Sequence, residues 1–102
     1  NTLYIGTTSE GLHAYSNGKF SRINSPDLDG AWISNIIAYK DGIAIISSNG
    51  LIKRTKNGKF ELISEKNGLA SNDLYNGLRD RENNLWLLQI ILLLFFQKYQ
   101  NQ

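Results

Sequence analysis

The sequence contains no cysteine and no methionine, and its only histidine is His13. Without cysteine, the chain cannot form a disulfide, a thiolate metal site or a cysteine nucleophile. A metal site built from several histidines is also excluded, and a Ser-His-Asp triad would have to use His13. His13 takes the place that Ile52 has in the repeat described below, so we interpret it as an ordinary strand residue.

Long apolar segments and concentrated charge are also scarce. The most apolar segment, residues 85–96 (LWLLQIILLLFF), has 12 residues including Gln89, whereas a helix needs roughly 20 to span a bilayer. The formal net charge is +2, and Lys and Arg are interspersed with Asp and Glu. No concentrated basic face is available for phosphate contacts. We therefore expect neither a transmembrane helix in this segment nor a nucleic-acid partner.

An internal repeat dominates the sequence. The tetrapeptide Asn-Gly-Lys-Phe occurs at residues 17–20 and again 40 residues later at 57–60. The flanking segments align as well: 3–5 with 43–45, 11–12 with 50–51, and 20–23 with 60–63. We divide the chain into a first unit at 1–40, a second at 41–80 and a partial third at 81–102 with an atypical apolar tail. The first unit starts at its second strand and ends with the inner strand of the next, so we expect the chain to be part of a longer array.

The units have the pattern of antiparallel β-meanders. Short apolar runs predict strands near residues 33–39, 43–47, 51–54, 59–63 and 74–79, and from residue 85 onward. They are closed by dipeptides that supply the positive φ angles of tight hairpins, namely Asn17-Gly18, Asp41-Gly42, Asn57-Gly58 and Asn83-Asn84. Four short strands in each period of about 40 residues are typical of β-propellers. We predict an all-β fold with about two and a half four-stranded blades of an incomplete β-propeller; a β-sandwich is the main alternative.

The loops of such a meander fall into two groups, because alternate connections emerge at the same end of a blade. One end carries the short hairpins and is basic, with Lys19, Lys40, Lys56, Lys59, Arg79 and Arg81. The other end carries the long links at 24–32 and 64–73 and is acidic. Long loops on a rigid scaffold are common binding sites. We therefore predict ligand-binding residues at the long-link end: Glu10, Asp29, Trp32, Asn72 and Asp73.

Each of these residues also has a simpler structural interpretation. Trp32 could stack on a sugar ring or pack between blades. Asn72, with Ser71, could contact a ligand or cap a turn before the inner strand. Asp29 and Asp27 suggest a calcium loop or an acid–base pair, but the further ligands of an EF-hand are missing and acids on a loop are common. We predict no catalytic residue, no metal and no cofactor.

The motifs resemble the two-component regulator propeller repeat, whose units follow the pattern N-L-W-I-G-T, G-L, G-x-F and G-L-x-S-N with an acidic turn. The matching segments are residues 3–7, 11–12, 18–20, 68–72 and 80–86. Three features depart from the pattern. Gly77 stands where a branched apolar residue is usual, residues 29–32 replace the first G-L-x-S-N loop, and residues 87–96 contain no glycine and no turn signal. The tail could be a buried strand, an apolar helix or sequence foreign to the repeat.

The resemblance implies an extracytoplasmic sensor region of a bacterial hybrid two-component protein, often responsive to carbohydrates, which precedes a membrane anchor and a histidine kinase. We expect a non-catalytic, ligand-binding fragment in the periplasm or outside the cytoplasm. Its expected partners are a small molecule or oligosaccharide, the remaining blades of the parent propeller, and other copies of itself. A propeller lyase or hydrolase and a protein-interaction scaffold remain alternatives, because fold alone does not choose among them.

Overall fold

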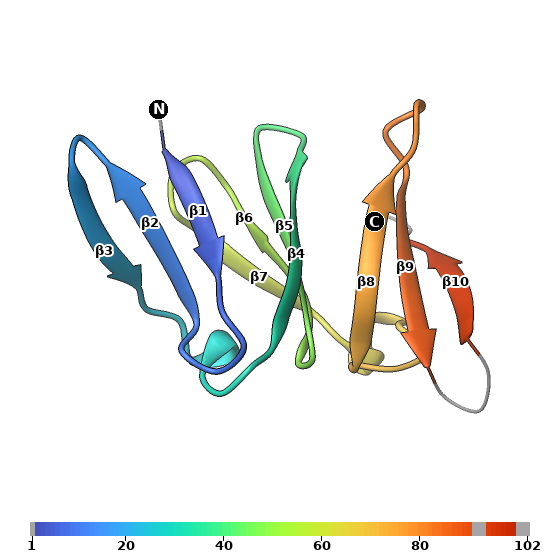
Figure 1. Ribbon diagram of the computed structural model, residues 1–102. Coiled ribbons are helices and arrows are strands. Elements are labelled where there is room, and N and C mark those ends of the chain that lie inside the picture. Colours follow the sequence, from blue (N-terminus) through green and yellow to red (C-terminus); the bar gives the residue numbers. More distant parts are fainter. Residues whose placement is uncertain (1, 91–93, 100–102) are drawn as a thin grey trace.

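The computed structural model describes residues 2–90 and 94–99. These residues form three antiparallel sheets that stand side by side in chain order and do not close into a ring (Figure 1). We name them sheets A, B and C. Two short 3-10 helices, η1 (Pro26–Leu28) and η2 (Glu65–Asn67), lie in the links between sheets, and the described residues contain no α-helix. The predicted all-β class is therefore confirmed.

Each sheet is a simple meander in which consecutive strands pair. Sheet A contains β1 (Leu3–Gly6), β2 (Leu12–Ser16) and β3 (Lys19–Ile23). Sheet B contains β4 (Ile33–Tyr39), β5 (Gly42–Ser47), β6 (Gly50–Arg54) and β7 (Phe60–Ile63). Sheet C contains β8 (Leu74–Arg79), β9 (Leu85–Ile90) and β10 (Leu94–Lys98). The strands expected from residue 33 onward are present, and their bounds differ from the predicted ones by at most one residue.

The hairpin turns follow the predicted chemistry with one exception. Asn17 and Gly18 both have positive φ angles, 53° and 78°, as a tight primed turn requires. In the turn between β4 and β5, the residue with positive φ is Lys40, at 53°, and not a member of the predicted Asp41-Gly42 pair. Gly42 is required for a different reason, since a Cβ there would overlap the carbonyl oxygen of Arg54 on β6.

Two apolar cores lie on either side of sheet B. The core between sheets A and B contains Leu12, Leu28, Ile33, Ile45 and Ile52. The core between sheets B and C contains Tyr39, Ala44, Ile46, Leu51, Ile63, Leu69, Leu74, Leu85 and Leu87. Successive side chains of a strand point to opposite faces, so β5 supplies Ile45 to one core and Ile46 to the other. The continuous apolar run of β5 follows from this burial on both faces.

The apolar tail is a pair of strands and not a helix. β9 and β10 run antiparallel, with Leu88 opposite Phe96; the connecting residues 91–93 lie outside the described part. Leu85 and Leu87 of β9 are fully buried against sheet B. Within residues 2–90 and 94–99, no helix is long and apolar enough to cross a membrane.

Candidate functional site

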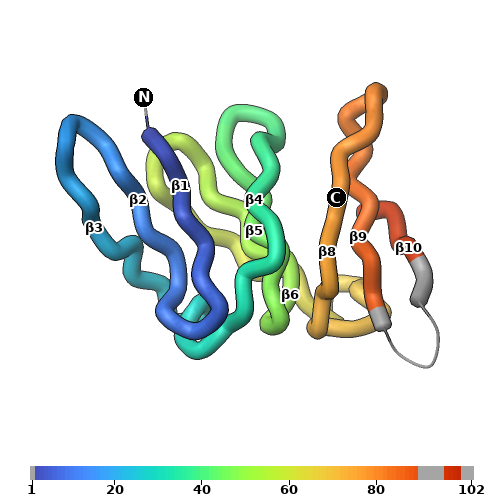
Figure 2. The backbone as a smooth tube through the Cα atoms, in the orientation of Figure 1, coloured from blue at the N-terminus to red at the C-terminus, as the bar shows by residue number. Residues whose placement is uncertain are grey.

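The predicted division of the loops into two ends is visible in the structure. The β1–β2 turn, η1, the β5–β6 turn and the η2 link lie at one end of the sheets (Figures 1 and 2). The β2–β3, β4–β5 and β8–β9 hairpins lie at the opposite end. All five predicted ligand-binding residues belong to links or turns of the first group. The structure therefore gathers them at one end, although they do not form a single site.

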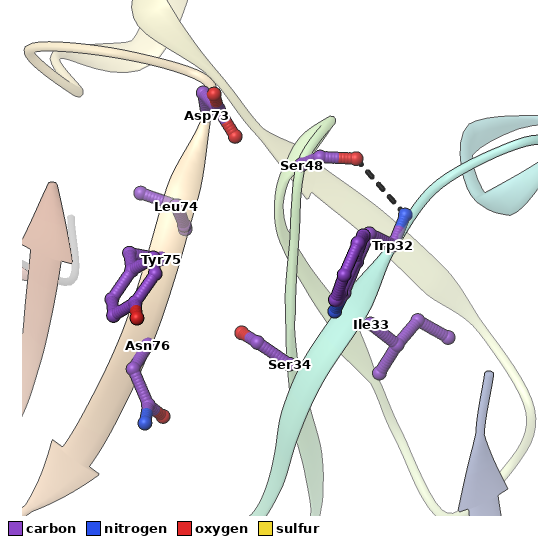
Figure 3. Close-up of a pocket in the computed structure, with 8 residues that line it drawn as sticks. All are labelled: Trp32, Ile33, Ser34, Ser48, Asp73, Leu74, Tyr75 and Asn76. Carbon is purple, nitrogen blue, oxygen red and sulfur yellow. Dashed lines mark hydrogen bonds between the residues drawn. The ribbon is translucent and has the colours of Figure 1, made fainter. Parts of the chain in front are cut away.

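A groove of about 480 Å³ opens between β4 and β8 at this end. Two of the predicted residues, Trp32 and Asp73, line it together with Ile33, Ser34, Ser48, Leu74, Tyr75 and Asn76. Figure 3 shows Trp32 and Ser34 on the β4 side and Asp73, Tyr75 and Asn76 on the β8 side. The aromatic side chains of Trp32 and Tyr75 are 60% and 59% exposed. The groove thus presents two accessible aromatic rings beside several polar groups.

The backbone of Trp32 is fixed while its indole stays exposed. Its N–H donates to Oγ of Ser48 at 3.0 Å, and its carbonyl oxygen accepts the N–H of Ser48 at 3.0 Å. These bonds extend the pairing between β4 and β5 by one residue beyond Ile33. The backbone of Trp32 therefore needs no further ordering when the indole contacts a ligand, which removes this part of the entropic cost of binding.

The same local irregularity occurs in both strands that flank the groove. The register shifts between Ile33 and Asn35 in β4, and between Leu74 and Asn76 in β8. Ser34 and Tyr75 are the residues passed over by these shifts, and both line the groove. A bulge of this kind re-aims side chains at the edge of a sheet.

Paired asparagines hold the two bulges together. Oδ1 of Asn35 accepts the N–H of Ile36 at 2.8 Å, and Oδ1 of Asn76 accepts the N–H of Gly77 at 2.7 Å. Nδ2 of Asn35 then crosses to sheet C and donates to Oδ1 of Asn76 at 3.2 Å and to the carbonyl of Gly77 at 3.1 Å. These bonds fix β4 relative to β8 next to the groove.

The loop that ends at Asp73 is stabilised by hydrogen bonds between its own residues. The side chain of Ser64 and that of Asn67 cap η2 reciprocally. Oδ1 of Asn72 accepts the N–H of Glu65 at 2.6 Å, and Oγ of Ser71 accepts the N–H of Asp73 at 3.1 Å. These contacts are the ones expected if Ser71 and Asn72 stabilise a turn. Asp73, which is exposed, is the residue of this loop that reaches the groove.

Two glutamines of sheet C, one buried and one half-buried, support the loop. Gln89 is fully buried, and its Oε1 accepts the N–H of Ser71 at 2.7 Å. Its Nε2 donates to Oε1 of Gln97 at 2.8 Å, and Nε2 of Gln97 donates to the carbonyl of Gly68 at 2.9 Å. Gln89 was given no role in the predicted site. As the single polar residue in the apolar segment 85–96, it was nevertheless a signal for a buried hydrogen-bonded side chain.

Glu10 and Asp29 lie at the same end but do not line the groove. Glu10 is exposed in the β1–β2 turn, where its N–H donates to Oγ1 of Thr7 at 2.8 Å. Asp29 forms an exposed ion pair with Arg22 at 3.8 Å, and such pairs contribute little to stability. Four lining residues were not predicted, namely Ser34, Ser48, Tyr75 and Asn76. The bulges that pass over Ser34 and Tyr75 depend on the partner strands, and Ser48 lies in the β5–β6 turn.

The hairpin end has a smaller, basic groove of about 230 Å³. Its lining includes Lys40, Lys53, Arg54 and Lys59. Burial, the largest single influence, lowers the pKa of Lys53, but hydrogen bonds with Tyr99 and Glu61 outweigh it and the pKa is raised overall. The described ranges contain no group of three or more His, Cys, Asp or Glu side chains that could hold a metal.

Comparison of the whole chain with protein-family models, with curated proteins and with solved structures gave no match.

Proposed function

We propose that the chain is a non-catalytic, ligand-binding part of a β-propeller and that it binds an oligosaccharide in the groove between β4 and β8. The main support for this proposal is that two exposed aromatic residues, Trp32 and Tyr75, line the groove. The polar side chains of Asp73, Asn76 and Ser34 lie beside them.

The strand register supports the propeller interpretation. Asn35 of β4 stands opposite Ile46 of β5, and Asn76 of β8 stands opposite Leu88 of β9. Sheets B and C are thus built in the same way from their first strands outward. β4 and β8 lie next to each other and are linked by asparagines, as the inner strands of neighbouring blades would be. Propellers repeat such four-stranded meanders around a channel.

The chemistry of the groove matches that of a sugar. A pyranose ring has an apolar face of C–H groups, which can pack on an aromatic ring, and a rim of hydroxyls that donate and accept hydrogen bonds. Trp32 and Tyr75 supply large apolar surfaces with few rotatable bonds. Asp73 supplies acceptors. Asn76 supplies the donors of its Nδ2, because its Oδ1 already accepts from Asn35 and Gly77. Ser34 donates its hydroxyl hydrogen to the carbonyl of Ile46 at 3.3 Å, so its Oγ is left as an acceptor. An apolar surface with a few convergent polar groups is the usual composition of a small-molecule site.

The wider role in our proposal follows from the motif resemblance. The parent would be a membrane-anchored two-component signalling protein whose propeller lies outside the cytoplasm. Binding in the groove would bridge sheets B and C, and a ligand that prefers one arrangement of the sheets shifts the population toward it. In this way the ligand would bias the downstream kinase without any chemical step in the propeller.

The proposal is tested by titration with maltohexaose, cellohexaose, laminarihexaose and xylohexaose. A Trp86→Phe variant leaves Trp32 as the only tryptophan, and we expect its fluorescence to change on binding. We expect Trp32→Ala and Tyr75→Ala each to weaken binding measured by calorimetry at least about tenfold, which corresponds to roughly 1.4 kcal/mol.

Tyr15→Ala is the matched control, because Tyr15 is an exposed aromatic residue on sheet A away from the groove. It should leave the affinity unchanged. Absence of binding to all four sugars, or unchanged affinity of the Trp32 and Tyr75 variants, would contradict the proposal.

A further inference from the structure

The outer face of sheet A, which points away from sheet B, exposes three large apolar side chains. Leu3, Tyr15 and Phe20 are 61%, 38% and 71% exposed. They form a row across the three strands, since Leu3 stands opposite Tyr15 and Tyr15 opposite Phe20. The two rings are in contact, with centroids 4.6 Å apart.

The corresponding row in sheet B is covered. Ile43 stands opposite Arg54, and Arg54 opposite Phe60, in the same register as the row of sheet A. Ile43 and Phe60 pack against the core between sheets A and B, and the guanidinium of Arg54 lies over the ring of Tyr4 and donates to its hydroxyl at 3.1 Å. The exposed row of sheet A therefore has the position of a face that packs against a preceding sheet.

The outer face of sheet C is its counterpart. Phe96 stands opposite Leu88, as Leu51 stands opposite Ile46 in sheet B. Leu51 and Ile46 are completely buried in the core between sheets B and C, whereas Phe96 is 52% exposed. Leu78, also on this face, is 47% exposed and takes the place of Ile37, which packs against that core. The outer face of sheet C thus has the position of a face that packs against a following sheet.

From this correspondence we propose that two copies of the chain pack head to tail, with sheet C of each copy against sheet A of the other. The contact continues the two inter-sheet contacts already present within one chain. A head-to-tail contact forms a ring when its rotation closes, and propellers close with roughly 4 to 8 blades. Two copies of the three described sheets together supply six sheets, a number within this range. The inference rests on the proposed propeller architecture, but not on the groove binding a sugar.

The test is the mass of the 102-residue chain in solution, measured by sedimentation equilibrium over a range of concentrations. We expect a species of twice the 11.5 kDa of one chain. Phe20→Glu on sheet A and Phe96→Glu on sheet C should each abolish it, because each places a charge in both contacts of the ring. Asn57→Glu adds the same charge in an exposed turn of sheet B and should leave the dimer intact. Circular dichroism checks that all variants keep their strands.

Mixing the two variants distinguishes a head-to-tail contact from one between identical faces. The mixture retains one unaltered pairing, between sheet C of the Phe20→Glu chain and sheet A of the Phe96→Glu chain. We expect it to recover a dimer although each variant alone is monomeric. A monomeric parent chain, an assembly larger than two copies, or dissociation by only one of the substitutions overturns the proposal. Loss of sugar binding in Trp32→Ala at unchanged mass concerns the groove alone, so the two proposals fail separately.

Discussion

Replacing Gln89 by leucine tests whether the buried glutamine stabilises sheet C and its loop. The side chain is fully buried between two hydrogen-bond partners, the N–H of Ser71 at 2.7 Å and Oε1 of Gln97 at 2.8 Å. Leucine has a similar size and would continue the apolar run of β9. If the apolar character of the segment alone stabilised it, Gln89→Leu would be neutral or favourable.

We expect the opposite, from the following magnitudes. Two lost hydrogen bonds cost about 1 kcal/mol each, and leaving the partly buried N–H of Ser71 without its acceptor costs about 1 to 3 kcal/mol. Leucine returns less than the roughly 1.5 to 3 kcal/mol of a newly buried aliphatic side chain, because the methylenes of Gln89 are already buried. The net loss in the free energy of unfolding is therefore about 2 kcal/mol. In a domain of this size, this corresponds to a fall in Tm of roughly 8 to 16 °C.

Urea unfolding, followed by circular dichroism at one protein concentration, measures this loss. A double-mutant cycle with Gln97→Leu should give a coupling energy of at least about 0.5 kcal/mol, because the two side chains contact each other. If Gln89→Leu is as stable as the parent chain, or if the two substitutions are simply additive, the reasoning is refuted.

Two further substitutions test packing and pH dependence. A Cβ at Gly77 would lie 3.1 Å from Cδ1 of Ile46 and 3.2 Å from the carbonyl oxygen of Trp86, so we expect Gly77→Val to lower the free energy of unfolding in urea by about 1 to 3 kcal/mol. A stabilised valine variant would contradict this. The hydrogen bond from the Trp86 indole, followed by that from the N–H of Asn84, lowers the pKa of Asp80 below its ordinary 3.8. The contribution of Asp80 to the free energy of unfolding is therefore present above pH 3.8 and is lost as the pH falls through the lower folded-state pKa. Between neutral and acidic pH, the urea stability of Asp80→Asn should change less than that of the parent chain. An equal change in both proteins would argue against this role.

The strands could be predicted from the sequence because their signals are local. Apolar runs of four to six residues ended by turn residues mark strands without knowledge of their partners. The φ angle of Lys40 could not be predicted in this way, because Gly42 already looked like the turn glycine. A glycine is required at position 42 because of the carbonyl of Arg54, which is twelve residues away in sequence. The sequence left the structure of the tail open for the same reason, because the partners of Gln89 are Ser71 in the η2 link and Gln97 across the β9–β10 pair.

The candidate site was predictable only in its location. Charge and loop length placed Trp32 and Asp73 at the long-link end, and the groove at this end is lined by both. Tyr75 was missed because its exposure depends on a register shift between β8 and β9, which no pattern within β8 reveals. Glu10 and Asp29 share the end of the sheets with the groove, but charge alone could not show that they belong to sheet A and its link.

The repeat itself indicates which groove residues would carry specificity in our proposal. When β4 and β8 are aligned by register, Ile33 corresponds to Leu74, and Asn35 corresponds to Asn76. These matched positions serve the core and the bond between strands, functions that every sheet of the array needs. The alternating positions differ: Trp32 corresponds to Asp73, and Ser34 corresponds to Tyr75. All four of these unmatched residues line the groove. The positions at which the two strands differ are thus the ones that make the two walls of the groove chemically different. A groove with two different walls can bind an asymmetric ligand in one orientation.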